Sequence, residues 1–248
     1  MVGGMGPDAT ILFLSMVVEL TDAATDQDHV DLDCLMHASI PDRTAFILGR
    51  SSANPVPLIQ ADLELLAGRG ATAVAIPCNT AHYFIDELQA ACPIPILNML
   101  TLAAAGVRRA YPAATRVAVL GTRGTVETGV YRAACEAVGL SLVPIGEEVQ
   151  RLADTVIFDR VKAGIAVEER LYLDLLEGGL RAGAEALLLA CTELSVPERR
   201  IAHSLPTVDA MVALAEATVL AAGKRLRPAR REARPDPPRA SSRAGWKV

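Results

Sequence analysis

Gly70-Ala-Thr-Ala-Val-Ala-Ile-Pro-Cys78-Asn79-Thr80 is the stretch that decides the fold, because a second stretch repeats its pattern. The repeat reads Gly183-Ala-Glu-Ala-Leu-Leu-Leu-Ala-Cys191-Thr192, and both the glycines and the cysteines lie 113 positions apart. Each copy begins with Gly-Ala, continues as a short apolar run and ends in a cysteine. Such a run is consistent with a buried strand. We therefore expect a duplicated unit whose two thiols face each other across one cleft, where a proton can leave one face of a carbon and return to the other.

A second repeat supports a chain of two similar halves. Gly3-x-x-Gly6-x-x-x-Thr10 matches Gly121-x-x-Gly124-x-x-x-Thr128, and each copy leads into a predicted helix. Short apolar runs alternate with amphipathic stretches, which is typical of an α/β fold with parallel strands. We predict two pseudo-symmetric lobes, each with a mainly parallel sheet flanked by helices, and an active site in the cleft between them. The predicted boundaries are 1–100 plus a helix at 209–223 for the first lobe and 101–208 for the second.

The predicted elements place both cysteine motifs at strand-to-helix turns. We predict strands at 31–38, 72–77, 94–97, 116–120, 142–145 and 186–190. We predict helices at 8–24, 56–68, 81–91, 99–110, 125–138, 147–163, 167–181 and 209–225. Ligands of open parallel sheets bind at the carboxyl ends of the strands, which is where both cysteines fall.

The composition predicts a reduced, cytoplasmic protein that neither enters a membrane nor binds nucleic acid. No apolar run approaches the roughly 18 residues of a membrane-spanning helix, and the N-terminus lacks the basic region of a secretory signal. Five cysteines in 248 residues are too sparse for a disulfide scaffold. A net charge of −5 with 4% aromatic residues offers no basic groove and no stacking surface for nucleic acid.

The charge is unevenly distributed along the chain. Residues 224–248 contain nine Lys or Arg against two acidic residues, a net charge of +7, whereas residues 1–223 carry −12. A Pro- and Arg-rich segment has little to bury, so we predict a disordered basic tail over 224–248. Contact with an anionic partner is the alternative interpretation of this tail.

The two thiols have surroundings that suit proton transfer. A cysteine at a helix N-terminus lies near unsatisfied backbone N–H groups, which lower a thiol pKa below its usual value of about 8.5 and attract anions. Asn79, Thr80 and Thr192 add side-chain donors beside the thiols. Two acid–base groups with a carboxylate-binding site suit the removal of an α-proton from an amino acid. A cysteine can also serve only as a small hydrophobic residue, and this is our interpretation of Cys34, Cys92 and Cys135.

Four motifs resemble those of one enzyme superfamily. Ile76-Pro77-Cys78-Asn79-Thr80-Ala81-His82 and Cys191-Thr192-Glu193-Leu194 resemble the two signatures of the aspartate/glutamate racemase superfamily. Gly3-Gly4-Met5-Gly6-Pro7 and Ile40-Pro41-Asp42-Arg43-Thr44 resemble its aspartate racemase branch. The resemblance implies racemisation of an acidic amino acid, preferably aspartate, by two bases without pyridoxal phosphate or another cofactor. It also implies two pseudo-symmetric α/β domains and a homodimer.

The same resemblance assigns roles to individual residues. Cys78 and Cys191 become the catalytic pair, and Arg43 binds a substrate carboxylate. Lys162 resembles a second cationic contact. The residues assigned to the α-carboxylate are Asn79, Thr80 and Thr192. The remaining candidates for substrate contact are Met5, Gly6, Thr122 and Glu193.

Several of these assignments have alternatives. Lys162 is the only lysine among residues 1–223, which favours a need for a compact point charge, but chance retention on a surface helix would also explain it. Arg43 has a similar alternative as a solvated loop charge. Glu193 stands where glutamate racemases typically have histidine, and it would either orient the substrate ammonium or form a local hydrogen bond. His82 would either tune the Cys78 thiol or cap its helix. Cys78 and His82 alone are too few for a metal site, which needs at least three ligands.

Two positions depart from the family pattern. Only Met1-Val2 precede the Gly-Gly-Met-Gly loop, where family members have a full strand, so we expect either an upstream start or a first lobe without a central strand. Ala190 replaces the glycine often found before the second cysteine.

The alternatives within the superfamily are a broad-specificity amino-acid racemase, a hydantoin racemase and a maleate isomerase. A non-catalytic carboxylate-binding relative is the alternative outside catalysis. Two cationic contacts favour a dicarboxylate over a neutral substrate.

Overall fold

Four parallel strands form the sheet of the second lobe in this computed structural model, which describes residues 1–228. Their order is β4–β3–β5–β6, with β3 at Arg116–Leu120, β4 at Ser141–Leu142, β5 at Ala186–Leu189 and β6 at Thr207–Asp209. Every residue of β5 is buried, as expected of a parallel strand between two layers of helices. Leu120 pairs with Leu189, and Leu189 pairs with Asp209. The residues that follow these three strands therefore meet at one edge of the sheet.

The first lobe has a much smaller sheet than the sequence predicts. Two strands pair in parallel, β1 (Val2–Gly3) and β2 (Leu35–Met36), and the predicted strand 31–38 is reduced to β2. The predicted strands 72–77 and 94–97 pair through one isolated bridge, Val74 with Ile96, and segment 72–77 joins β1 through the Val2 N–H, which donates to the Ala75 carbonyl at 3.1 Å. Prolines at positions 77, 93 and 95 have no N–H to donate to a ladder, so this part of the sheet lacks continuous pairing.

Helices flank both sheets. The first-lobe helices are α1 (Pro7–Leu20), η1 (Asp26–Asp28), α2 (Arg43–Ile47), α3 (Val56–Gly68), η2 (Thr80–Phe84) and α4 (Ile85–Ala91). Those that follow are α5 (Met99–Ala110), α6 (Arg123–Glu127), α7 (Arg132–Ala137), α8 (Gly146–Asp154), η3 (Thr155–Val161), α9 (Glu169–Arg181), α10 (Ser195–Glu198) and α11 (Ala210–Ala221).

Several predicted helices differ from the observed ones: 81–91 divides into η2 and α4, 209–225 is α11, which ends at Ala221, and three others differ for local reasons. The helix predicted at 8–24 ends at Leu20, where Thr21 becomes extended and donates its hydroxyl to the Val17 carbonyl. The helix predicted at 125–138 is two helices, because Gly129 between them has a φ of 63°. The helix predicted at 147–163 changes from α8 to the π-helical η3 at Thr155. The sequence prediction also missed β1, η1, α2, α10 and β6.

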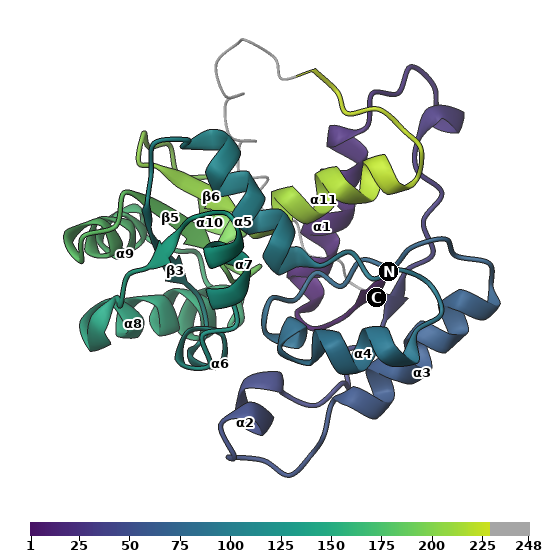
Figure 1. The fold of residues 1–248 in the computed structure, drawn as a ribbon, viewed down its shortest axis with the longest axis horizontal. Coiled ribbons are helices and arrows are strands. Elements are labelled where there is room, and N and C mark those ends of the chain that lie inside the picture. Colours follow the sequence, from purple (N-terminus) through teal and green to yellow (C-terminus); the bar gives the residue numbers. More distant parts are fainter. Residues whose placement is uncertain (229–248) are drawn as a thin grey trace, which may run out of the picture.

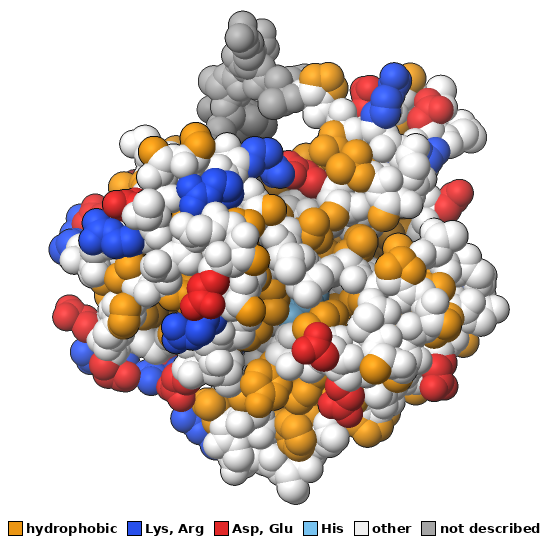
Figure 2. Space-filling view, viewed as in Figure 1, with side chains coloured by type: hydrophobic (Ala, Val, Ile, Leu, Met, Phe, Trp, Pro, Cys, Tyr) orange, Lys and Arg blue, Asp and Glu red, His pale blue; other side chains and the backbone are white. Residues whose placement is uncertain are grey.

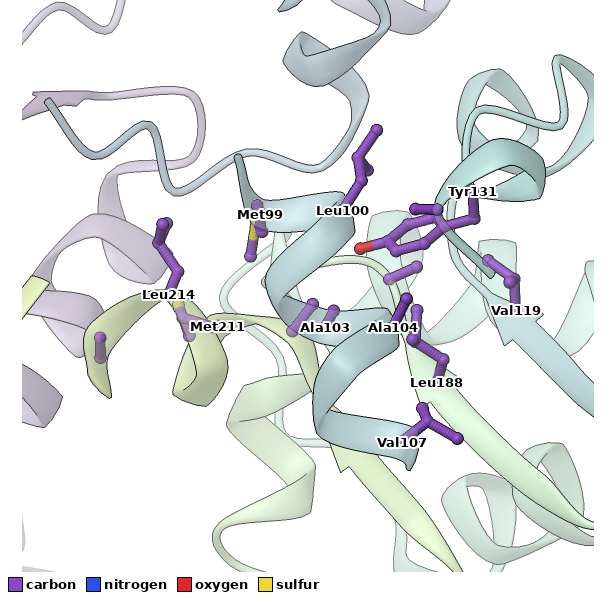
Figure 3. Packing of buried hydrophobic residues seen from close by; sticks show 14 of the residues in the cluster. Met99, Leu100, Ala103, Ala104, Val107, Val119, Tyr131, Leu188, Met211 and Leu214 are labelled. Atoms are coloured by element: carbon purple, nitrogen blue, oxygen red, sulfur yellow. The ribbon is translucent and has the colours of Figure 1, made fainter. Parts of the chain in front are cut away.

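One apolar cluster joins the two lobes. Helix α5 packs against α11, and α11 packs in turn against α1. Figure 1 shows these three helices between the second lobe at left and the first lobe at right. Met99, Ala103 and Val107 of α5 are fully buried, and Figure 3 shows this helix between α11 and the strands of the second lobe. The predicted return of the C-terminal helix to the first lobe agrees with the contact between α11 and α1, although the exact domain boundaries stay a prediction.

Residues 224–228 are not part of a tail. Leu226 forms an antiparallel bridge with Thr21, and the Arg227 N–H donates to the Leu20 carbonyl at 2.7 Å. Residues 229–248, which hold most of the predicted tail, lie outside the described residues. In the described part of the chain, none of the helices has the length and apolarity to cross a membrane. The face in Figure 2 carries acidic and basic side chains beside one another over the second lobe.

A large cavity lies away from both cysteine motifs. It has a volume of about 540 Å³ and is lined by residues 30–33 and 69–73 together with Met1, Leu97 and the end of α11. Neither Cys78 nor Cys191 lines it. Cavity volume alone would therefore not identify the two cysteine motifs as the candidate site.

Candidate active site

Both motif cysteines lie at the carboxyl ends of the strand segments that precede them. Cys78 follows the buried segment 74–77 and stands two residues before η2, whereas Cys191 follows β5 and Ala190. Each cysteine is 6% exposed. The two side chains line the same cavity between the lobes. The repeat found in the sequence thus delivers two thiols to one place.

The surroundings of Cys78 are hydroxyl and amide groups. The side-chain oxygen of Asn79 accepts a hydrogen bond from the Tyr131 hydroxyl of the second lobe. Thr80 Oγ1 lies 3.0 Å from the hydroxyls of both Thr122 and Thr125. Burial raises the pKa of Tyr131 well above its usual value, with further contributions from nearby acidic groups, so this hydroxyl stays a donor. These contacts tie the loop of Cys78 to the second lobe.

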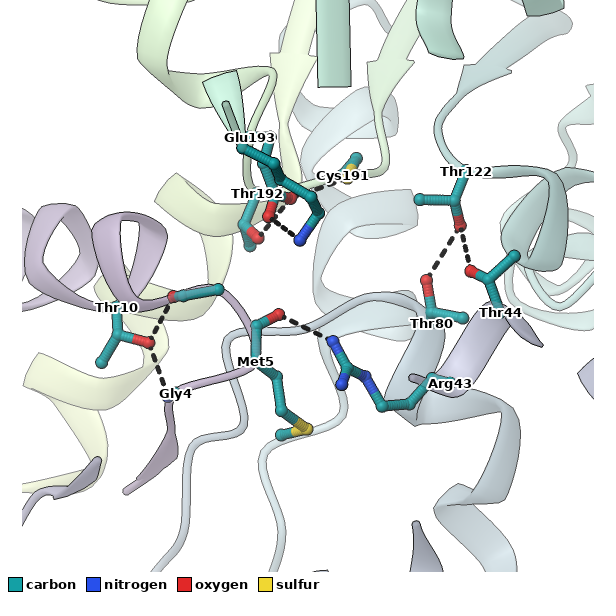
Figure 4. Close-up of polar contacts among 12 residues, drawn as sticks. Gly4, Met5, Thr10, Arg43, Thr44, Thr80, Thr122, Cys191, Thr192 and Glu193 are labelled. Carbon is teal, nitrogen blue, oxygen red and sulfur yellow. Dashed lines mark hydrogen bonds and ion pairs between the residues drawn. The ribbon is translucent and has the colours of Figure 1, made fainter. Parts of the chain in front are cut away.

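The surroundings of Cys191 are charged. Glu193 accepts a hydrogen bond from the Cys191 thiol at 2.9 Å and another from the Thr192 hydroxyl at 3.2 Å, and its second oxygen pairs with Lys162 Nζ at 2.6 Å (Figure 4). Burial raises the pKa of the Cys191 thiol well above its usual value, and the Glu193 carboxylate adds to this effect. The sequence-based expectation of a lowered thiol pKa is therefore wrong for Cys191. The expectation considered only backbone N–H groups, whereas burial and a carboxylate dominate here.

Lys162 stands at the end of η3 and is half-buried. Burial lowers the pKa of its ammonium, but the Glu193 carboxylate outweighs burial, so that the net shift is upward and the side chain is a cation. It is not a free surface charge. The contact with Glu193 also shows that Glu193 forms local interactions in this structure.

Arg43 is held by the backbone of its own lobe. Its Nη1 donates to the carbonyls of Ile40 and Pro41 at 3.2 and 3.0 Å, and its Nη2 donates to the Met5 carbonyl at 3.1 Å. Figure 4 shows the guanidinium below Glu193, with Met5 beside it. These contacts fix the direction of the Arg43 side chain. A solvated loop charge, the alternative interpretation of Arg43, would not need such contacts.

Two buried donors at this cavity lack partners. Within residues 1–228, neither Arg43 Nε nor Asn79 Nδ2 has a hydrogen-bond partner. An unpaired buried donor is costly unless a ligand or water completes it. Both residues line the cavity between the thiols. The orphaned donors therefore mark where an acceptor, such as a carboxylate, would bind.

The glycine loop of the first lobe approaches the second lobe closely. Gly4 has a φ of 90°, and a Cβ on it would meet the backbone of His37 at 2.5 Å. A Cβ on Gly6 would lie 2.6 Å from Glu193 Oε1. Gly6 does not line the cavity itself but leaves the room that the Glu193 carboxylate occupies.

The cavity collects nearly all the residues that the sequence singled out. The predicted residues that line it are Met5, Arg43, Cys78, Asn79, Thr80, Thr122, Lys162, Cys191, Thr192 and Glu193. Sequence reasoning missed three further lining residues, Asp42, Thr44 and Phe158. Asp42 caps α2 by accepting from the Ala45 N–H at 2.6 Å, and an Asp after a proline was the available signal for that short helix. No pattern in the sequence pointed to Phe158.

His82 has a structural position. Its Nε2 accepts from the Met99 N–H at 3.1 Å, so its Nδ1 carries the proton and donates to the Cys78 carbonyl at 2.9 Å. Burial lowers the pKa of this imidazole and keeps it neutral. His82 caps α5 and connects it to the loop of Cys78. Among the described residues, no group of three or more His, Cys, Asp or Glu side chains forms a metal site.

Comparison with known proteins places the chain among racemases. A family model described as Asp/Glu/Hydantoin racemase matches residues 2–218. The chain is 25% identical over 226 residues to the broad specificity amino-acid racemase RacX of Bacillus subtilis, covering 87% of this chain and 94% of that protein. It is 30% identical over 190 residues to the glutamate racemase of Deinococcus radiodurans, covering 72% of this chain and 59% of that protein.

Solved structures of similar proteins share the two-lobe fold. The aspartate racemase of Picrophilus torridus superposes with a TM-score of 0.79 at 31% identity, covering 91% of this chain and 94% of that chain. An aspartate racemase homologue from Pyrococcus horikoshii superposes with a TM-score of 0.71 at 20% identity, covering 90% of this chain and 97% of that chain, which shows a common fold.

Proposed function

This chain belongs to the Asp/Glu/hydantoin racemase family, and we propose that it interconverts L- and D-aspartate without a cofactor. The observation that carries the proposal is a single cavity lined by two thiols, Cys78 and Cys191, and by two cations, Arg43 and Lys162. The similarity to the aspartate racemase of Picrophilus torridus supports the choice of aspartate.

The proposed reaction moves one proton at a time. One cysteine, as thiolate, takes the α-proton, and the electrons of the broken C–H bond pass into the substrate carboxylate as an enolate. The other cysteine, as thiol, donates its proton to the opposite face of the same carbon. The α-carbon is inverted, and the two cysteines have exchanged protonation states. General acid–base steps of this kind contribute about 10²–10⁴-fold each.

The orphaned donors supply the charge stabilisation that this step requires. An enolate carries more negative charge on its carboxylate oxygens than the substrate does, so fixed donors there lower the barrier. Asn79 Nδ2 and Arg43 Nε are buried and have no partner among the described residues. The Tyr131 hydroxyl donates to the Oδ1 of the same Asn79 amide, so Asn79 Nδ2 keeps its direction without substrate.

The charges of the cavity favour an amino dicarboxylate. The cations Arg43 and Lys162 and the carboxylate of Glu193 line the cavity, whereas the fourth charged lining residue, Asp42, uses its carboxylate to cap α2. Aspartate has the complementary set, two carboxylates and one ammonium. Maleate has no ammonium to contact Glu193, and a neutral hydantoin has no carboxylate to contact Arg43, so each forms fewer contacts between opposite charges than aspartate does. This comparison ranks aspartate above both alternatives.

Substrate binding requires the cavity to widen. Its volume of about 20 Å³ holds roughly one water molecule, which is far less than an amino acid occupies. Phe158 and Lys162 line it from η3 and the residue after it, and Asp42 and Thr44 line it from α2 and the residue before it. We infer that these segments move apart when aspartate enters.

Proton exchange tests the proposal directly. The protein is incubated with L-aspartate in deuterated buffer without pyridoxal phosphate, and NMR follows the α-proton while chiral chromatography follows D-aspartate. We expect deuterium at the α-carbon together with D-aspartate. A folded protein that gives neither product contradicts the proposal.

A broad-specificity amino-acid racemase is the second candidate, because RacX of Bacillus subtilis is similar over most of both chains. The same assay with neutral and basic amino acids separates the two activities. Comparable rates with neutral substrates would favour broad specificity. Binding of aspartate without any α-proton exchange would indicate a non-catalytic carboxylate-binding protein.

A further inference from the structure

Glu193 uses both carboxylate oxygens on groups of the cavity. Oε2 lies 2.9 Å from Cys191 Sγ, and Oε1 lies 2.6 Å from Lys162 Nζ. The side chain is 5% exposed. A carboxylate is only an acceptor when it is ionised, so the contact with Cys191 requires the sulfur to carry its proton. Loss of that proton would place two anions in contact in a buried site.

The first-lobe cysteine has no such partner. In the part of the chain that the structure describes, no carboxylate accepts a hydrogen bond from Cys78. Its motif neighbours Asn79 and Thr80 are engaged instead with the Tyr131, Thr122 and Thr125 hydroxyls. The two copies of the repeat therefore place their thiols in electrostatically different surroundings.

We propose that Glu193 is a positioning residue that keeps the proton on Cys191, so that the free protein rests with Cys191 as a proton donor. The role of Cys191 as donor in the reaction rests on the proposed racemase activity. The effect of Glu193 on the pKa of the Cys191 thiol is independent of that activity, because it is a property of the protein without substrate.

The charges around Cys191 act in opposite directions. Glu193 opposes the thiolate, whereas the Lys162 ammonium favours it. Tyr131 faces Cys191 from the start of α7 as a neutral phenol. The other ionisable groups that line the cavity are Asp42, Arg43 and Cys78. Because Lys162 pairs with Glu193 at 2.6 Å, removal of the carboxylate both deletes an anion and leaves a cation without its counterion.

The glycine loop of the first lobe holds this arrangement in place. A Cβ on Gly6 would come within 2.6 Å of Glu193 Oε1, so the carboxylate is confined between Gly6, Lys162 and Cys191. The confinement keeps Oε2 directed at the sulfur. Contacts from both lobes thus define the position of Glu193.

The test is a thiol titration without substrate. The ultraviolet absorbance of thiolates is measured against pH, and the same curve for a Cys191→Ser variant is subtracted, which isolates Cys191 from the other four cysteines. The comparison is made in the parent protein, in Glu193→Gln and in Lys162→Gln, each with its own Cys191→Ser counterpart. Glu147→Gln serves as a matched control, because Glu147 pairs with Arg123 and its side chain is 66% exposed.

We expect Glu193→Gln to move the Cys191 midpoint downward by about one to three pH units, the usual effect of one charge within 4–6 Å. Lys162→Gln is expected to leave the midpoint unchanged or raise it, and Glu147→Gln to leave it unchanged. An unchanged or raised midpoint in Glu193→Gln overturns the proposal, as does a lowered one in Lys162→Gln. If circular dichroism shows that Glu193→Gln is unfolded, Glu193→Asp, whose shorter carboxylate withdraws from the sulfur, must show a downward shift.

The titration and the racemase assay fail independently. A shifted midpoint with no racemisation supports the role of Glu193 and contradicts the proposed function. Racemisation with an unshifted midpoint supports the function and contradicts the role of Glu193.

Discussion

Cys78 and Cys191 are equivalent in the sequence repeat but not in the structure. The Cys78 loop is held by neutral groups, the Tyr131 hydroxyl on Asn79 and the hydroxyls of Thr122 and Thr125 on Thr80. The Cys191 thiol lies against an ion pair of Glu193 and Lys162. The difference shows that a duplicated backbone can present two thiols to one cavity while the residues around them give the two thiols different electrostatic surroundings.

Loss of either thiol is expected to have the largest effect. Cys78→Ala and Cys191→Ala should each lower racemisation by about 10²–10⁴-fold, the range of a general acid–base step, with the fold intact by circular dichroism. Each variant retains one base, so each should exchange the α-proton of only one enantiomer with deuterated solvent. Exchange from both enantiomers in either single variant would show that the cysteines do not divide the two faces between them.

Gly6→Ala should disturb the Cys191 side of the comparison alone. The added methyl meets Glu193 Oε1 at 2.6 Å, so the carboxylate must move, at a cost of about 1–3 kcal/mol typical of overpacking. We expect a lower unfolding midpoint in denaturant and a lowered Cys191 titration midpoint.

Gly68→Ala is the matched control for this change. No atom lies within 4 Å of a Cβ at Gly68, which ends α3. Alanine there should be neutral or stabilise the protein by up to about 1 kcal/mol. Equal destabilisation by both substitutions would contradict the specific contact between Gly6 and Glu193.

Tyr131→Phe should act mainly on the Cys78 side, where the hydroxyl donates to Asn79. It leaves the buried Asn79 carbonyl oxygen without its donor, which costs about 1–3 kcal/mol and lets the amide rotate. Urea unfolding should report the loss of stability, and the KM for aspartate should rise. An unchanged KM would show that the direction of the Asn79 amide does not matter for substrate binding.

Thr122→Val should have the smallest effect of the four. Thr122 caps α6 by accepting from the Thr125 N–H at 3.4 Å, and its hydroxyl also forms a hydrogen bond with the Thr80 hydroxyl. Loss of an N-cap costs about 1 kcal/mol, and valine keeps the shape of the side chain. The measurement is the unfolding free energy in urea, and a loss well above 2 kcal/mol would indicate that the hydroxyls support the interface between lobes rather than one cap.

The parts predicted correctly from the sequence are those governed by local patterns. The helices at 56–68 and 99–110 and the strand at 116–120 match the observed bounds, because their periodicity and end signals lie within the segment itself. The short strands of the first lobe were predicted too long, since strand length depends on a partner from elsewhere in the chain. The π-helical turn at Thr155–Val161 has no marker in the residue pattern.

The sequence by itself determined that two thiols end two copies of one strand-to-helix unit, and parallel pairing then requires both to lie at carboxyl ends of strands. Only the tertiary structure decided which charged groups surround the Cys191 thiol. Lys162 lies 29 positions before Cys191 and Gly6 lies in the other lobe, yet both contact Glu193. The physical reason is that proton affinity depends on burial and on charges within a few ångströms, and distance in space is set by the fold rather than by position in the chain.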